Sequence, residues 1–241
     1  LQKPKVAILS GDGTSSYGVG EVWHLMNYRM GIPVSLINAK NLNIWKLSKY
    51  NTIILPDGGY GPNGSYGDLD TTDINALKGW IKNGGTLISI QSGSKWVVNK
   101  KIVKEKIKNP LKQTLDIPYD QVSMVTGGQR IGGAIFEVDL DNTHPIGYGY
   151  NKKAPVFRRG DTFFDLSTSS AANVARYTNK PLLSGYISEE KLVEMKNTAS
   201  IIARREGSGH VILFADNPSF RAFWYGSNGL LLNAVFFGRS Y

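Results

Sequence analysis

The segment Ser89-Ile90-Gln91-Ser92-Gly93 joins a short apolar run to residues with helical spacing. It has the form small-x-nucleophile-x-glycine, which is typical of a strand–turn–helix elbow that holds its central side chain exposed above a sheet. The central residue here is Gln91. A carboxamide has neither an ionisable thiol nor a hydroxyl, so it cannot act as a nucleophile. The sequence therefore predicts an elbow without the reactive group that such turns present.

Apolar runs on both sides of this elbow alternate with helical segments. We expect strands over residues 5–9, 33–37, 51–55, 86–90, 199–203 and 210–215, and helices over residues 19–30, 71–81 and 227–237. Thr71 or Thr72 is predicted to cap the second helix, and Ser94 the helix after the elbow. Short connections in such an alternation favour right-handed βαβ units. The predicted class is α/β, with a mostly parallel, doubly wound sheet covered on both faces.

The alternation stops between residues 109 and 196. Glycine pairs such as Gly127-Gly128 and Gly132-Gly133 separate short apolar runs there. Such runs predict an inserted region of antiparallel strands and long loops. We interpret residues 1–241 as a single domain that carries this insertion. The sequence starts Leu1-Gln2-Lys3-Pro4, without methionine or a signal peptide, and we expect it to be a fragment of a longer protein.

The composition excludes several classes of protein. Hydrophobic residues make up 41% and charged residues 20% of the 241, as in a globular chain with a sizeable core. The absence of cysteine excludes disulfides, thiolate–zinc sites, iron–sulfur clusters and a cysteine nucleophile. No apolar run approaches the roughly 20 residues that cross a bilayer, so no membrane span is predicted.

Basic residues are in excess. Lys and Arg number 28 against 19 Asp and Glu, and part of the net charge of +9 lies in the lysine-rich stretch 95–112. A basic stretch of this kind can bind nucleic acid or an acidic surface. This one has no arginine, and no aromatic residue follows Trp96 in it, both of which argue against nucleic-acid readout. We interpret the stretch as solvated helix and loop and predict no nucleic-acid partner.

Ligands of doubly wound sheets bind beyond the carboxyl ends of the strands. Two further glycine-rich turns lie at such ends, at residues 10–16 and 56–61. A Walker loop is absent, and Ser16 stands where a dinucleotide fingerprint needs its third glycine. The candidate pocket residues at the strand ends, the first helix and the last loop are Asp12, Glu21, Asp57, Gly58, Gly59, Ser92, Arg221 and Trp224.

The elbow, the Gly58-Gly59 loop and the late segment 214–219 together resemble the class I glutamine amidotransferase-like fold. The resemblance implies a flavodoxin-like three-layer sandwich in which the glycine loop builds an oxyanion hole. That family has a cysteine nucleophile at the position of Gln91, and a His-x-Glu pair at the positions of Asn217 and Ser219. All three catalytic positions are changed, so no catalytic residue is predicted in this chain.

More closely, the chain resembles the amidotransferase-like domain at the C-terminus of certain bacterial, secreted zinc carboxypeptidases of the carboxypeptidase A type. The segments that carry this resemblance are residues 18–25, 84–88, 217–222 and 231–234. It implies an upstream peptidase domain as partner, with zinc bound there, and a secreted or periplasmic location. No metal site or cofactor is predicted within this chain, because none of His24, His144 and His210 has Glu three residues after it.

Three functions stay open. The first is a catalytically inactive domain that supports or positions a carboxypeptidase. The second is a divergent hydrolase with Ser92 as nucleophile and Asp12, Glu21 or Asp57 beside it, although no base is evident. The third is a module that binds a small molecule, a carbohydrate or a peptide through aromatic rings near loop ends. Those rings are Tyr17, Tyr60, Tyr66, Trp96, Trp224 and Tyr225.

Arg221 follows the late strand, just before the last helix. A buried arginine needs a carboxylate partner. We expect Arg221 to form a structural ion pair with Asp216, Asp57 or Glu21 at the mouth of the former active site.

Overall fold

A single mixed sheet organises the chain. The computed structural model describes residues 2–40, 42, 46–59, 66–67, 69–110 and 117–241. Within them, nine strands form one sheet in the order β2-β1-β3-β4-β9-β8-β7-β5-β6. Neighbours from β2 to β9 in this order pair in parallel, and the remaining neighbours pair antiparallel. The predicted α/β class with a doubly wound, flavodoxin-like core is confirmed.

The bounds of the elements agree with the predicted alternation. The strands are β1 (Val6–Ser10), β2 (Val34–Asn38), β3 (Thr52–Leu55), β4 (Thr86–Ile90), β5 (Ala134–Leu140), β6 (Lys153–Arg158), β7 (Asn173–Gly185), β8 (Ala199–Glu206) and β9 (Gly209–Phe214). The α-helices are α1 (Ser16–Trp23), α2 (Thr71–Lys82), α3 (Ser92–Asn99), α4 (Tyr119–Gly128), α5 (Glu189–Met195) and α6 (Asn228–Phe237). A π-helical segment, His24–Arg29, continues α1, so the first predicted helix is present with a wider last turn.

Two predicted helix caps are wrong by a few residues. The N-cap of α2 is Asp70, whose side chain accepts a hydrogen bond from the Asp73 N–H at 2.8 Å, while Asp73 reaches back to the Asp70 N–H. This reciprocal pair bonds the backbone N–H groups of both residues, so Asp70 caps the helix in place of Thr71 or Thr72. The helix after the elbow begins at Ser92, so Ser94 lies inside it, buried, and its hydroxyl bonds to the Phe214 carbonyl at 2.9 Å.

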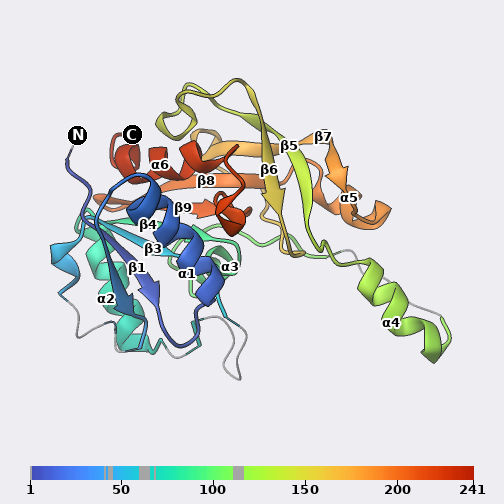
Figure 1. Ribbon diagram of the computed structural model, residues 1–241, viewed down its shortest axis with the longest axis horizontal. Coiled ribbons are helices and arrows are strands. Elements are labelled where there is room, and N and C mark those ends of the chain that lie inside the picture. Colours follow the sequence, from blue (N-terminus) through green and yellow to red (C-terminus); the bar gives the residue numbers. More distant parts are fainter. Residues whose placement is uncertain (1, 41, 43–45, 60–65, 68, 111–116) are drawn as a thin grey trace.

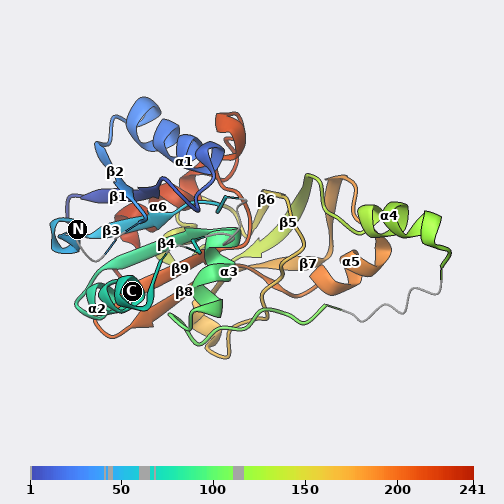
Figure 2. The ribbon, with the colours of Figure 1, turned by 90° about the horizontal axis from the view of Figure 1, so that it is seen from below.

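Helices cover both faces of the sheet. Figure 2 shows α1 and α6 on one side of the sheet and α2 and α3 on the other. One buried apolar cluster joins the inner faces of α1 and α6 to the sheet, and a second joins α2 and α3 to its opposite face. Because both faces are covered, the central strands are buried at nearly every position.

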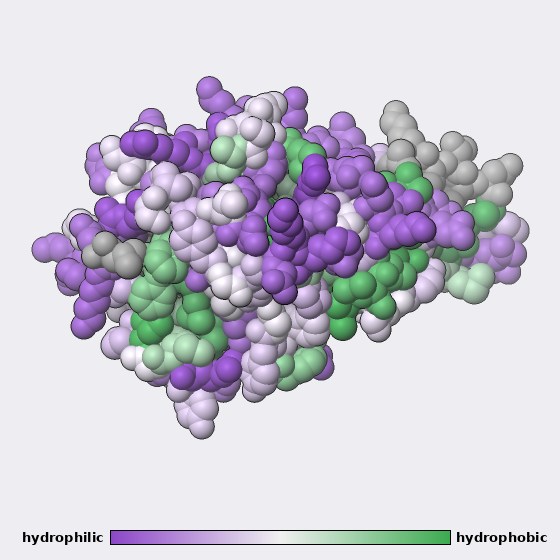
Figure 3. Space-filling view, turned by 90° about the horizontal axis from the view of Figure 1, so that it is seen from above, coloured by the Kyte–Doolittle hydropathy of each residue, from purple (hydrophilic) through white to green (hydrophobic). Residues whose placement is uncertain are grey.

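The region between residues 109 and 196 extends the same sheet. Antiparallel strands are present there as expected, in the form of β5, β6 and the long, irregular β7, whereas the helix α4 was not predicted. Figure 1 shows α4 projecting from this end, and none of its residues is buried. The face in Figure 3 is mostly hydrophilic, with hydrophobic patches on both halves of the view, one of them toward the end of the sheet that β5 and β7 form.

The lysine-rich stretch has the solvated character that its composition predicts. Its exposed members are Lys95, Lys100, Lys101, Lys104 and Lys106, while Lys108 is half-buried and Lys112 lies outside the described residues. No described helix has the length and hydropathy that crossing a bilayer requires.

A buried ion pair joins the antiparallel extension to the parallel core. Arg158, the last residue of β6, is 1% exposed, and its Nη1 lies 3.4 Å from Oδ1 of Asp216, just after β9. The same Nη1 donates to the hydroxyl of Tyr177 on β7 at 2.9 Å and to the Ala215 carbonyl at 3.1 Å. Tyr177 and Ser200 donate in turn to the Asp216 carboxylate. Four strands therefore meet at one pair of charges.

We predict that Arg158→Met lowers the free energy of unfolding by about 3–5 kcal/mol, because it leaves the buried Asp216 charge without its partner. The double variant Arg158→Met/Asp216→Asn is expected to recover part of that loss, since no buried charge remains. Urea denaturation followed by circular dichroism measures both. As a control, Lys153→Met breaks an ion pair with Glu137 in which the lysine side chain is 59% exposed, and should cost far less than Arg158→Met.

Candidate functional site

Gln91 occupies the predicted elbow between β4 and α3. Its backbone has φ 50° and ψ −114°, a strained conformation for a residue with a side chain. Its N–H donates to the Phe214 carbonyl of β9 at 2.8 Å, which ties the turn to the sheet. Two residues on, a Cβ on Gly93 would lie 2.8 Å from the Pro56 carbonyl oxygen, so only glycine permits this approach of the loop after β3. Ser89, two residues before Gln91, is fully buried. Packing therefore requires a small residue on both sides of the elbow.

Asp57, Gly58 and Ser92 form a closed set of hydrogen bonds beside the elbow. The Ser92 hydroxyl donates to Oδ1 of Asp57, and the same oxygen accepts the Ser92 N–H at 3.2 Å. The Gly58 N–H donates to the Ser92 Oγ at 2.6 Å. The Gly59 N–H donates to the Gly13 carbonyl at 3.0 Å. Each of these backbone donors is bonded within the protein.

These are the donors with which an elbow of this type stabilises an oxyanion. An oxyanion hole uses the N–H of the residue after the nucleophile together with an N–H from a neighbouring loop. Here those positions correspond to Ser92 N–H and the Gly58-Gly59 loop, and the Asp57 and Ser92 side chains already accept from them. Donors that are already satisfied by the protein cannot stabilise a developing negative charge without rearrangement.

The Gln91 side chain is also engaged. Its Nε2 donates to the carbonyl oxygen of Arg159 at 3.2 Å, in the loop that follows β6. The elbow therefore faces the antiparallel extension, and the carboxamide links the two parts of the sheet.

Glu21 on α1 contacts the turn after β9, which contains Asn217 and Ser219. Its Oε2 accepts from Nδ2 of Asn217 at 2.7 Å, and its Oε1 accepts from the Arg221 N–H at 2.7 Å. The Oδ1 of Asn217 accepts from the Ser219 N–H at 3.0 Å. The Ser219 hydroxyl is buried and has no hydrogen-bond partner among the described residues. Asn217 and Ser219 thus shape the turn after β9, and the Asn217 side chain is bonded to Glu21 and to the Ser219 backbone.

Burial raises the pKa of Glu21, and the nearby Asp57 carboxylate adds to this rise. The hydrogen bonds from Asn217 and the Arg221 N–H oppose it, as does the positive charge of Arg159. Glu21 reaches this position because Gly18, one turn earlier on α1, lets the helix pack against Asp57. A Cβ on Gly18 would lie 3.1 Å from the Asp57 nitrogen.

The prediction for Arg221 is wrong. Its side chain is exposed, and the described residues include no carboxylate in an ion pair with it. The buried arginine at this end of the sheet is Arg158, and its partner is Asp216, one of the three carboxylates proposed for Arg221. Only the backbone of Arg221 contacts a carboxylate, because the tight turn after Asn217 directs its N–H toward Glu21.

The other predicted site residues differ in how exposed they are. Asp12 is exposed, whereas Trp224 is half-buried and donates from Nε1 to the Ser227 hydroxyl at 2.9 Å. Tyr66 and Trp96 pack together in the core with ring centroids 5.6 Å apart, so they cannot contact a ligand. Tyr17 and Tyr225 are exposed, and Tyr60 lies outside the described residues.

Three residues at this site were missed. Phe157 stacks on Phe220 after β9, with centroids 3.9 Å apart, while Arg158 and Arg159 make the contacts given above. The signal for Arg158 is present in the sequence, since alternation along 153–158 puts it on the buried face with Ala154 and Val156.

Two cavities lie away from this site. A cavity of about 230 Å³ lies between the N-terminal segment and α6, and one of about 470 Å³ lies beside β5, Asp141 and Arg176. In the part of the chain that the structure describes, no three His, Asp or Glu side chains are grouped to hold a metal ion.

Comparison with known proteins identifies the fold. The sequence matches no protein-family profile and no curated protein. The structure is similar to PurLQS from Thermotoga maritima, with a TM-score of 0.61 and 16% identity over 99% of this chain and 98% of the other. A glutamine amidotransferase from Thermotoga maritima gives 0.59 and 11% identity, covering all of both chains. A putative ThuA-like protein from Bacteroides uniformis gives 0.53 and 13%, over 96% and 89%. At these identities the comparison shows a glutamine amidotransferase-like fold, and no more than the fold.

We predict that Glu21 titrates above 4.5, the ordinary value for a glutamic acid. The buried carboxyl keeps its proton at pH values where the unfolded chain has lost it. The contribution of Glu21 to stability is therefore full below that ordinary value and falls as the pH rises through the folded pKa. Urea unfolding of the native chain and of Glu21→Gln between about pH 4 and 8 measures this difference. Parallel pH profiles for the two proteins would contradict the prediction.

Proposed function

We propose that this chain is a non-catalytic amidotransferase-like domain, which binds and positions a partner and breaks no bond. The single observation that carries the proposal is the state of the elbow. Its central residue is a carboxamide, and the Asp57 and Ser92 side chains accept the backbone donors that an oxyanion would need. Acyl transfer needs a nucleophile, a base and free oxyanion donors together, and the arrangement supports none of the three.

We further propose that the domain belongs to the C-terminal part of a secreted zinc carboxypeptidase. Support comes from the sequence segments at residues 18–25, 84–88, 217–222 and 231–234. The peptidase domain would then lie outside this sequence and hold the zinc, and this chain would be its partner. The coding sequence upstream of Leu1 is expected to contain His-x-x-Glu and a later histidine. An upstream region without such a motif contradicts this parentage.

A divergent hydrolase is the second candidate, because the Ser92 hydroxyl does donate to a carboxylate. However, Ser92 Oγ also accepts the Gly58 N–H, which engages one of its two lone pairs and holds the hydroxyl in place. Moreover, Ser92 is the first residue of α3 and lies one position beyond the strained residue of the elbow. The geometry thus favours a structural role for this hydroxyl.

Activity assays test the absence of catalysis. The purified chain is expected to release no ammonia from glutamine and to hydrolyse no ester or amide faster than buffer alone. Gln91→Cys supplies a thiol at the elbow and is expected to stay inactive on glutamine, because Asn217 is no base and the oxyanion donors stay bonded. Alkylation by iodoacetamide shows whether the new thiol is presented, with Ser123→Cys on the exposed α4 as the matched control.

Two results would overturn the proposal. Glutamine hydrolysis by the unaltered chain or by Gln91→Cys would show that the donors can be released. Ester or amide hydrolysis that Ser92→Ala abolishes would establish the divergent hydrolase instead.

A further inference from the structure

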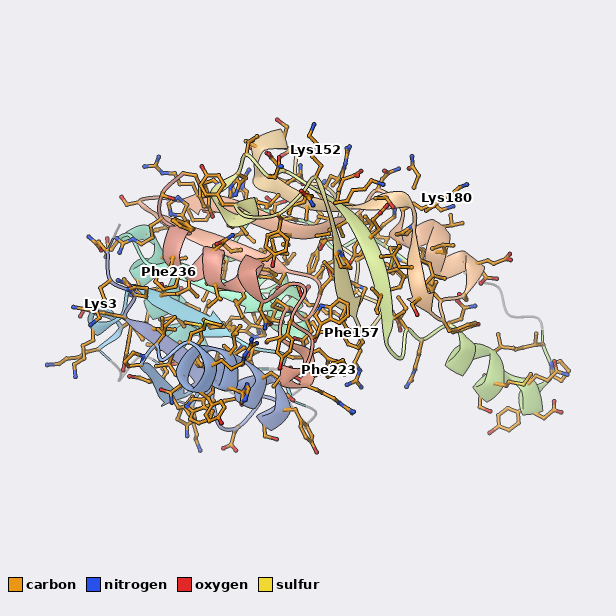
Figure 4. All side chains as sticks on the ribbon, turned by 45° about the horizontal axis from the view of Figure 1, so that its top comes forward. Lys3, Lys152, Phe157, Lys180, Phe223 and Phe236 are labelled. Atoms are coloured by element: carbon orange, nitrogen blue, oxygen red, sulfur yellow. The ribbon has the colours of Figure 1, made fainter. Side chains whose placement is uncertain are left out.

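Two arginines and three phenylalanines gather at the mouth of the elbow, and we call them the Arg–Phe cluster: Phe157, Arg159, Phe220, Arg221 and Phe223. Phe157 lies on β6 and Arg159 directly follows that strand, whereas the other three residues lie in the segment after β9. Phe157 and Phe220 stack with an interplanar angle of 17°, and Phe223 meets Phe220 edge-on with centroids 5.9 Å apart. Figure 4 shows Phe157 and Phe223 on these two adjacent segments.

Both guanidiniums of the cluster are directed to the same ring. The Cζ of Arg159 lies 6.0 Å and that of Arg221 5.3 Å from the centroid of Phe220. The two charges are therefore at most about 11 Å apart, which is the sum of these distances. Contact with an aromatic face stabilises a cation but leaves the N–H donors of the guanidinium available to an anion.

Neither guanidinium has an anionic partner in the described part of the chain. Both side chains are exposed, and none of the ion pairs in that part includes them. Glu21, whose pKa the Arg159 charge lowers, is buried and already accepts hydrogen bonds from Asn217 and the Arg221 backbone.

The turn that presents Arg221 is strained and held in place. Arg221 and Ala222 both have positive φ, 48° and 57°, and neither is glycine. This conformation is unfavourable for a residue with a side chain, so the turn persists only because surrounding contacts fix it. Among these contacts are the Glu21 carboxylate on the Arg221 N–H and the Ala222 N–H on the Ser219 carbonyl. Strain maintained in this way preorganises a side chain for binding.

The chemistry of the cluster indicates its ligand. Arginine clusters recognise acidic motifs, and arginine and large aromatic residues are frequent anchors of interfaces. Phe223 is 58% exposed beside the guanidiniums, so it offers an apolar contact next to two cations. In an extended peptide, residues i and i+2 share a face and lie about 7 Å apart, which fits two carboxylates to two guanidiniums within the limit above.

We propose that the Arg–Phe cluster binds an extended acidic peptide segment, with two carboxylates at alternate positions on Arg159 and Arg221 and an apolar side chain on Phe223. The net charge of +9 would speed the approach of such a segment. The inference rests on the proposed binding role and is independent of the carboxypeptidase parentage.

Fluorescence anisotropy with the whole 241-residue chain tests the proposal. The probe is a fluorescein-labelled octapeptide with two glutamates at alternate positions and one phenylalanine, and the matched probe has glutamines in their place. The glutamate peptide is expected to bind about tenfold more tightly. Arg159→Gln and Arg221→Gln should each weaken its binding by about the same factor, and Phe223→Ser should weaken both probes.

The control is Arg205→Gln, which removes the same charge from an exposed arginine at the β8–β9 turn. It should leave binding unchanged, and thermal melting of each variant checks the fold. Equal affinity for the two probes, or an equal loss with Arg205→Gln, would overturn the proposal. So would tighter binding of polygalacturonate than of the acidic peptide. A failure here leaves the hydrolysis assays unaffected, so the two proposals can fail separately.

Discussion

A guanidinium and a carboxylate that leave water together are stable only when they pair closely and their remaining polar atoms are bonded. Arg158 and Asp216 come close to this condition with Tyr177, Ser200 and the Ala215 carbonyl, although the Arg158 Nε has no hydrogen-bond partner among the residues that the structure describes. Burial raises the pKa of Asp216, and the Arg158 charge opposes that rise. Because Asn217 follows Asp216 directly, the same pair fixes the turn that meets α1.

Two further carboxylates, those of Asp57 and Glu21, hold the loops of the site in place. Asp57 accepts the donors beside the elbow, and Glu21 holds the turn after β9. Glu21 belongs to α1, and the absence of a side chain at Gly18 on the same helix allows close contact with Asp57. The elbow geometry of an acyl-transfer fold is thus retained while its polar groups satisfy one another. Such a scaffold can present side chains for binding without a reactive centre.

Local patterns in the sequence were sufficient for the elbow and for most core elements. β4 has the predicted bounds, and Gln91 has the strained backbone that the spacing of Ser89 and Gly93 implies. The buried arginine was expected in the right region but at the wrong residue, since Arg221 is exposed and Arg158 is buried. β6 was not predicted because Lys152, Lys153 and Pro155 obscure its alternation, although Arg158 lies on its buried face.

The sequence by itself determined the α/β class and an elbow with a carboxamide at its centre, because each depends on residue type and short spacing. Only the tertiary structure decided which groups meet. Glu21 and Asn217 are 196 positions apart, and Ser92 and Gly58 are 34 apart. Contacts at such separations depend on strand order and on the close approach of loops at one edge of the sheet, which no local pattern encodes. For the same physical reason, the convergence of Arg159 and Arg221 on one ring emerged only with the fold.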